Sequence, residues 1–326
     1  MTENSQIRKM AHLELASRAQ TGAEHLDRRF NYEPMFFAHE NVSSTEVNFL
    51  HFKLDFPLWI SSMTGGTAEA FTINQNLSKL AGKYGLGLGL GSCRPLLESD
   101  ERLRDFDLRN NTAGPLFANL GLAQVEELVL SNRSSTIHEL VKRLQVDGLM
   151  IHINPLQEWF QPAGDRFKQS PLVTINRFLE TSRYPIFVKE VGHGIGPKSL
   201  EALLSMGIAG IEFGAFGGTN FSKLEMLRSE GQVIKSNFIN VGHSSEEMIE
   251  FLNSMTLGNK EFIISGGIKD PLDALYLQNK FKKKALIGMA HSFLAPARVS
   301  FESLEKYFLE FKEAYVYGKQ LLEVKE

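Results

Sequence analysis

The chain has 326 residues, of which 43% are hydrophobic and 22% charged, a composition typical of globular proteins and not of disordered, fibrous or disulfide-stabilised ones. With 35 basic and 38 acidic residues the formal net charge is -3, so no overall positive field favours nucleic acid or an anionic membrane. A single cysteine excludes an intrachain disulfide, and the sequence has neither an apolar signal segment nor a run of about 18 apolar residues. We therefore expect a cytoplasmic protein with no membrane or nucleic-acid partner.

Short runs rich in Val, Ile, Leu and Phe recur along the chain, and each is followed by a segment long enough for a helix. This alternation is typical of βα units around a parallel sheet. Eight units favour a (β/α)8 TIM barrel over a doubly wound sheet, which usually has fewer strands and one glycine-rich phosphate turn near its start. We predict strands at residues 57–60, 85–91, 115–120, 148–153, 185–191, 210–213, 262–265 and 285–288.

The segments on either side of the repeat predict additions to a single barrel domain at residues 56–300. Residues 1–55 open with an amphipathic segment, and we expect them to form an N-terminal extension folded against the barrel. Residues 301–326 carry apolar side chains at helical spacing and predict a C-terminal helix. The basic run at residues 280–284 is interpreted as a solvated surface between a helix and a strand.

The active site of such a barrel lies where the strands end, so the residues after each apolar run carry the functional information. Residues 61–67, SSMTGGT, would let a flat ligand approach the backbone, or would form only a tight turn. Residues 85–91 alternate glycine with leucine, which leaves one face of that strand bare, but their spacing does not match a GxGxxG dinucleotide motif. Glycine-rich turns after the last two strands are typical of a phosphate site, and FMN would place a flat ring over the barrel mouth.

The fourth strand is followed by the cluster His152, Asn154, Gln157 and Glu158. His152 and Asn154 are two residues apart and project to one face of the strand. A single carboxylate beside water and phosphate oxygens is what Mg²⁺ usually requires of a protein. Without further information, a structural histidine remains the more frequent reading of His152.

The second and fifth strands end in residues with open alternatives. Arg94 is either an anion ligand or part of a salt bridge between loops, and Cys93 has no evident base that would make it a nucleophile. Lys189 lies inside an apolar strand and needs a partner, because an unpaired buried ammonium is costly. It could form a Schiff base, pair with Glu190 or stabilise negative charge on a cofactor, although adjacent strand residues point to opposite faces.

Motifs at these strand ends and in the N-terminal extension form one set. They are Arg8-Lys9 with His12, ISSMTGG (60–66), GS-x-R (91–94), Asn119, H-x-NPLQE (152–158), VKEVG-x-G (188–194), GGTNF (217–221) and SGGI (265–268). Together these motifs resemble one family over nearly the whole chain, the type 2 isopentenyl-diphosphate isomerases, flavoenzymes that interconvert isopentenyl and dimethylallyl diphosphate. SGGI is common among FMN barrels, whereas NPLQE combined with an N-terminal Arg-Lys pair is specific.

The resemblance implies roles for individual residues. Substrate contacts are expected from Arg8, Lys9, His12, Arg94, His152, Asn154 and Gln157, the catalytic residues being Gln157, Lys189 and His152. Glu158 is the expected Mg²⁺ ligand. Flavin contacts are expected from Ser62, Met63, Thr64, Ser92, Asn119, Lys189 and Thr219, with Gly266, Gly267, Ala290 and His291 around the flavin phosphate.

The family uses reduced FMN and Mg²⁺, with NADH or NADPH as reductant, although the reaction involves no net redox change. The resemblance therefore implies a small-molecule diphosphate substrate and a homo-oligomer, either a tetramer or an octamer. The alternative is another FMN barrel enzyme of the 2-hydroxy-acid oxidase or dehydrogenase type, which would leave NPLQE without a role. The sequence departs from the family pattern at Cys93, Glu212, Gly214, Lys269 and His291.

Overall fold

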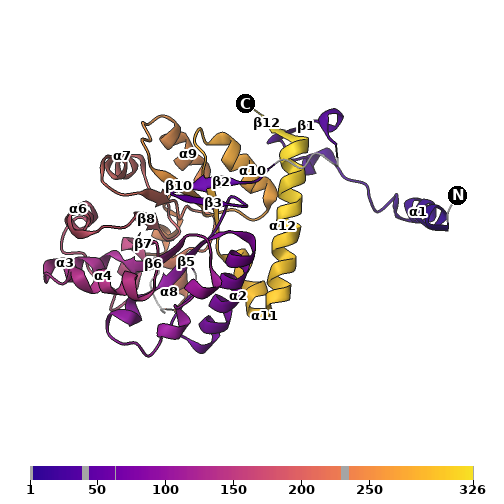
Figure 1. Ribbon diagram of the computed structural model, residues 1–326. Helices are drawn as coiled ribbons and strands as arrows, with labels where there is room; N and C mark the ends of the chain where they lie inside the picture. Colours follow the sequence, from indigo (N-terminus) through magenta and orange to yellow (C-terminus); the bar gives the residue numbers. More distant parts are fainter. Residues whose placement is uncertain (1–2, 39–43, 63, 229–234, 326) are drawn as a thin grey trace.

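Eight parallel strands form a closed barrel in a computed structural model that describes residues 3–38, 44–62, 64–228 and 235–325 (Figure 1). Each strand pairs with the next in sequence, and the last closes the barrel against the first. The predicted TIM barrel is therefore confirmed, with strand limits within two residues of those expected. The barrel strands are β4 (Leu58–Ile60), β5 (Gly87–Ser92), β6 (Leu116–Gly121), β7 (Gly148–Ile153), β8 (Ile186–Glu190), β9 (Gly210–Glu212), β10 (Glu261–Ser265) and β11 (Leu286–Met289).

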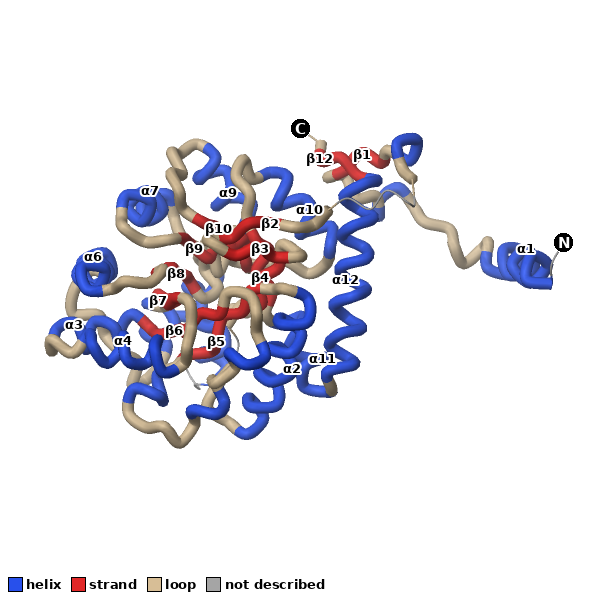
Figure 2. The backbone as a smooth tube through the Cα atoms, viewed as in Figure 1, coloured by secondary structure: helices blue, strands red, loops and turns tan. Residues whose placement is uncertain are grey.

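Helices surround the barrel, as Figure 2 shows. Local signals in the sequence set the ends of these helices. At the start of the helix Ala68–Tyr84, the Thr67 side chain accepts a hydrogen bond from the Ala70 backbone N–H, and Gly85 ends this helix with a φ of 58°. The helices that follow barrel strands are α2 (Ala68–Tyr84), α3 (Leu122–Leu130), α4 (Ser134–Arg143), α5 (Pro155–Phe160), α6 (Pro171–Thr181), α7 (Pro197–Ser205), α8 (Phe221–Arg228), α9 (Ser245–Asn253), α10 (Pro271–Lys280), α11 (His291–Val299) and α12 (Phe301–Leu321).

A layer of large aromatic side chains fills the barrel at the N-terminal ends of its strands. Trp59, Phe117 and Phe187 pack there together with Phe49 from the hairpin formed by β2 (Val47–Phe49) and β3 (Phe52–Leu54). The bare face of β5 accommodates this layer, because a Cβ on Gly87 would lie 2.2 Å from the Trp59 ring. The opposite end of the barrel remains for the site.

The N-terminal extension folds against the barrel only in part. The β2–β3 hairpin does so, and β1 (Phe30–Tyr32) pairs antiparallel with β12 (Leu322–Val324). By contrast α1 (Glu3–Leu15) stands apart from the barrel, and its apolar side chains such as Leu13 are exposed (Figure 1). The apolar face of α1 therefore has no partner within the described chain. The expected terminal helix is also shorter than predicted, because the chain after Leu321 pairs with β1.

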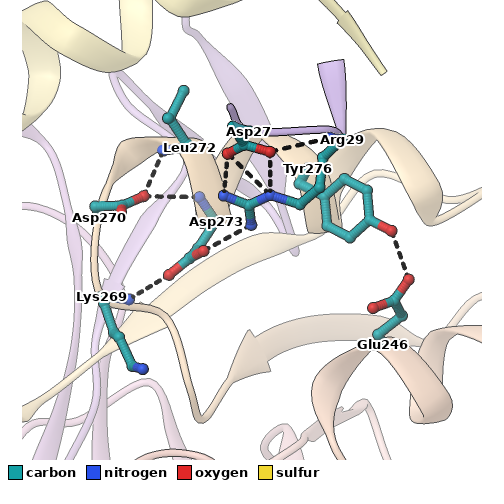
Figure 3. A network of polar contacts seen from close by, with 8 residues as sticks. All are labelled: Asp27, Arg29, Glu246, Lys269, Asp270, Leu272, Asp273 and Tyr276. Carbon is teal, nitrogen blue, oxygen red and sulfur yellow. Dashed lines mark hydrogen bonds and ion pairs between the residues drawn. The ribbon is translucent and has the colours of Figure 1, made fainter. Parts of the chain in front are cut away.

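A polar network attaches the extension to α10 (Figure 3). Arg29 donates to Asp27 and, through Nη1 at 2.7 Å, to Oδ1 of Asp273. The other oxygen of Asp273 accepts the backbone N–H of Lys269 at 2.9 Å, and Asp270 caps the helix. The network therefore connects residues 27–32 to the turn that follows β10.

None of the helices in the described residues is long and apolar enough to cross a membrane.

Candidate active site

A cavity of about 270 Å³ opens at the C-terminal ends of the barrel strands. Its lining comes from the ends of the strands and from the loops that follow them. The site residues expected from the sequence that line this cavity are Ser62, Ser92, Asn119, His152, Gln157, Lys189, Thr219, Gly266, Gly267, Ala290 and His291.

Other expected residues do not line the cavity. The substrate residues on α1 lie apart from the barrel with that helix (Figure 1), and Met63 lies outside the described residues. Arg94 forms the inter-loop salt bridge that was one of its two alternatives, with Nη1 3.1 Å from Oδ2 of Asp165. The expected residues away from the cavity lining are Arg8, Lys9, His12, Thr64, Arg94, Asn154 and Glu158.

Lys189 is buried at the cavity wall, and its partner is Glu212 on the neighbouring strand β9. Glu190 is not that partner, since its Oε2 accepts the backbone N–H groups of Val191, Gly192 and His193 at 2.6–2.8 Å. Burial nevertheless raises the pKa of Glu190 to about 7, while these hydrogen bonds act to lower it. The carboxyl groups of Glu190 and Glu212 therefore both line the cavity, together with Lys189.

His152 is held in one orientation by its neighbour on β6. Its Nδ1 lies 2.9 Å from Oδ1 of Asn119, an atom that only accepts, so Nδ1 carries the proton. Desolvation, followed by the charge of Lys189, lowers the pKa of His152 to about 3. The ring is thus neutral at physiological pH, with Nε2 available as an acceptor.

The β7–α5 junction brings polar side chains together. Asn154 donates through Nδ2 to Oε1 of Gln157 at 3.0 Å and to Oε1 of Glu158 at 2.8 Å. The other oxygen of Glu158 accepts the Asp165 backbone N–H at 2.7 Å. In the described part of the chain, no group of three His, Cys, Asp or Glu side chains could hold a metal ion. A divalent cation here would need phosphate or water oxygens as further ligands.

A buried carboxylate on α8 was missed by the sequence analysis. Oε1 of Glu225 accepts the side-chain amide of Gln157 at 3.5 Å and that of Gln161 at 3.1 Å. Glu225 is four residues beyond GGTNF, and helical spacing alone gives no reason to orient it toward α5. Its negative charge is the one feature in the sequence that could have marked Glu225 as a candidate site residue.

Two buried hydroxyl groups and a glycine turn also line the cavity. Oγ of Ser61 and Oγ of Ser62 are buried and have no hydrogen-bond partner among the residues that the structure describes. Gly266 has a φ of 99°, and a Cβ there would lie 2.1 Å from the backbone oxygen of Ala215. These features suit a flat ligand with hydrogen-bonding edges, because unpaired buried polar atoms are costly.

Cys93 has no catalytic character. Its side chain is fully buried, its Sγ lies 3.4 Å from the backbone oxygen of Gly91, and burial raises the pKa of the thiol to about 12. The thiolate form needed for nucleophilic attack is therefore absent at neutral pH.

The chain is similar in sequence to curated proteins of one name, although no protein-family model matches it. It is 33% identical over 307 residues to an isopentenyl-diphosphate delta-isomerase of Rickettsia felis, covering 91% of this chain and 86% of that protein. It is 30% identical over 314 residues to the protein of the same name from Deinococcus radiodurans, covering 94% and 90%.

Solved structures of flavoproteins resemble the fold. A mandelate oxidase variant with an FMN adduct superimposes with a TM-score of 0.58 at 13% identity, covering 91% of this chain and 88% of that one. A flavocytochrome b2 variant with benzoylformate has a TM-score of 0.61 at 14% identity, covering 90% and 71%. At these identities the likeness concerns the fold alone.

Proposed function

The chain belongs to the type 2 isopentenyl-diphosphate delta-isomerases, and we propose that it interconverts isopentenyl and dimethylallyl diphosphate with reduced FMN and Mg²⁺. The observation that carries the proposal is the convergence of His152, Gln157 and Lys189 on one cavity in a chain with these relatives. A hydroxy-acid oxidase would leave Gln157, Glu158 and their shared hydrogen-bond donor Asn154 without a task.

The residues around the cavity fit FMN. The unpaired hydroxyls of Ser61 and Ser62 would bond the edge of the ring, and the glycine turn at residues 266–267 leaves backbone space for the phosphate. When bound and reduced, FMN supplies an electron-rich surface that stabilises positive charge on a tertiary carbon. The residues proposed to hold it are Ser62, Thr64, Ser92, Asn119, Lys189, Thr219, Gly266, Gly267, Ala290 and His291, together with Met63.

The side chains near the ring have distinct proposed tasks. Lys189 provides the positive charge that stabilises an anionic ring in a buried site, although it also forms an ion pair with Glu212. His152 is neutral, so it does not repel the developing cation, and its Nε2 can accept a hydrogen bond. Gln157 is oriented by Asn154 and Glu225 and places its amide next to the reacting carbons.

Glu158 fits Mg²⁺ as a single carboxylate ligand. Within the described chain each of its oxygens accepts one hydrogen bond, which leaves further lone pairs for a cation. Water and substrate phosphate usually complete the coordination of Mg²⁺. The ion would neutralise the diphosphate. Arg8, Lys9 and His12 would then bind the same diphosphate once α1 approaches the barrel mouth, with Arg94 as a helper that also holds Asp165.

NADH or NADPH would reduce the flavin. Met35 and Phe36 are 89% and 84% exposed in the single chain, which supports a homo-oligomer, a tetramer or octamer, in which such side chains find cover.

Anaerobic incubation of the full chain with isopentenyl diphosphate tests the function. Dimethylallyl diphosphate is expected only when FMN, a reductant and Mg²⁺ are all present, and chelation of Mg²⁺ should stop its formation. Absence of product in the complete mixture, with oxidation of a 2-hydroxy acid by the oxidised flavoprotein instead, would replace this proposal by the oxidase alternative.

A further inference from the structure

A lobe leaves the barrel between β9 and α9. Its described parts are residues 220–228, which include α8, and residues 235–241, which include the 3-10 helix Lys235–Asn240. The lobe packs on α5, where Lys235 lies 4.7 Å from the ring centroid of Trp159 and donates to its backbone oxygen at 3.2 Å. The ring centroid of Phe238 lies 5.0 Å from that of Trp159. The lobe therefore supports the helix that carries Gln157 and Glu158.

His193, from the loop after β8, is bonded to both ends of this lobe. Its Nδ1 lies 2.6 Å from the backbone oxygen of Val241, and its Nε2 lies 2.8 Å from Oγ of Ser222. A carbonyl oxygen only accepts, so Nδ1 carries the proton and Nε2 accepts the hydroxyl hydrogen of Ser222. Both side chains are buried, which makes the loss of either bond costly.

The position of His193 is itself fixed by the barrel. Its backbone N–H donates to Oε2 of Glu190 at 2.6 Å, and its backbone oxygen accepts the N–H of His243 at 2.8 Å. A Cβ on Gly242 would lie 2.4 Å from the same oxygen, and this glycine has a φ of 156°. The close approach of the two loops thus needs a glycine at this point.

The hydrogen bond between His193 and Ser222 affects Gln157 through α8. Ser222 and Glu225 are three residues apart and lie on the same face of that helix. Glu225 is the residue that accepts the amide of Gln157, so the attachment of Ser222 sets where this acceptor lies.

We propose that His193 is a positioning residue, which ties both ends of the lobe to the β8 loop so that Glu225 holds the Gln157 amide at the cavity. The proposal rests on the proposed function, because it assigns the purpose of this connection to the orientation of Gln157. The attachment of the lobe to α5 can be measured without an activity assay.

Trp159 reports on the lobe directly. The other tryptophan, Trp59, is fully buried, so acrylamide quenching of the full chain without added flavin measures mainly Trp159. We expect His193→Ala to raise the quenching constant roughly twofold, since the segment it ties opens locally. The matched control is His138→Ala, which removes a histidine bonded to Tyr184 and Thr181 away from the cavity and should leave quenching unchanged.

Steady-state kinetics test whether His193 positions Gln157. With reduced FMN and Mg²⁺, we expect His193→Ala to lower kcat about tenfold, the effect of one buried hydrogen bond lost from the transition state, with KM and FMN affinity nearly unchanged. His193→Gln, whose amide can donate and accept, should recover part of the loss. If His193→Ala fails to fold by circular dichroism, Ser222→Ala takes its place.

Quenching and kcat at wild-type values in the folded variant would overturn the proposal, as would equal losses in kcat and FMN affinity. A wild-type chain without isomerase activity would instead refute the proposed function, and the quenching comparison would still decide whether His193 holds the lobe.

Discussion

Nζ of Lys189 lies 3.4 Å from Oε2 of Glu212, and the two residues are direct neighbours across β8 and β9. Their side chains are only 8% and 1% exposed. No hydrogen-bond donor in the described part of the chain reaches Oε2 of Glu212, so the contact with Lys189 is an ion pair without a supporting hydrogen bond to that oxygen. Burying two charges costs several kcal/mol for each, which their attraction offsets only in part. The pair is thus better explained by a need for a cation at the cavity than by stability.

Removing one charge of this pair should destabilise the protein more than removing both. We expect Glu212→Gln to lower the free energy of unfolding by about 3 kcal/mol, because Lys189 is left buried without a counter-charge. The double variant Lys189→Met/Glu212→Gln should recover most of that loss. Urea unfolding at neutral pH measures both values. Equal stability of the single and double variants would show that Lys189 has another counter-charge or is reached by water.

The barrel was predictable because each of its strands is a local pattern. The apolar runs, the glycines that end them and the helices between them are adjacent in sequence, and parallel pairing follows from their order. The strand-end residues followed from the same rule, which is why Ser62, Asn119 and Lys189 meet in one cavity.

Partners formed between strands or helices were not predictable. Glu212 faces Lys189 only through the register of β8 and β9, and Glu225 meets Gln157 only because α8 packs on α5. Likewise β12 exists because the chain end returns to β1, across nearly the whole sequence. The periodicity of a single sequence does not show which strands or helices pack on one another. The sequence therefore predicted residues of the site but not the side chains that hold them in place.

Glu190 should make stability depend on pH. Its pKa is raised from 4.5 to about 7, so between these values the native state binds the proton more tightly than the unfolded chain. The stability that this group contributes therefore falls as pH rises through that window. Glu190→Gln keeps one oxygen for the three N–H donors and has no proton to lose, so it should match wild type near pH 4.5 and exceed it by about 3 kcal/mol above pH 7.

Denaturant unfolding at several pH values checks this difference between wild type and the variant. His152 contributes the opposite trend, because its lowered pKa makes stability fall as pH drops below 6.5. That trend is common to both proteins and cancels in the comparison. A difference that does not change between pH 4.5 and 8 would mean that Glu190 titrates normally.

Glu158 should determine the response to Mg²⁺. We expect Glu158→Gln to raise the Mg²⁺ concentration needed for half-maximal isomerisation at least about tenfold, since a neutral amide is a poorer ligand for a hard cation. Flavin binding should be unaffected, as Glu158 does not line the cavity. Product formation across a Mg²⁺ titration gives the result. Glu127→Gln, at a carboxylate 70% exposed on α3, is the matched control, and equal Mg²⁺ curves for both variants would exclude Glu158 as the ligand.

The network in Figure 3 should protect the extension from proteolysis. Asp273 uses one oxygen for Arg29 and the other for the Lys269 N–H, so Asp273→Asn keeps an acceptor for only one of the two donors. We expect a loss of about 1–2 kcal/mol in unfolding free energy and faster tryptic cleavage at Arg28 or Arg29. Mass spectrometry of the fragments identifies the cut. Asp100→Asn, which breaks an ion pair to Arg143 on α4, controls for the loss of a surface charge. Identical cleavage rates in the two variants would mean that the β1–β12 pairing alone holds this segment, whereas release confined to Asp273→Asn would identify the Arg29 contact as its anchor.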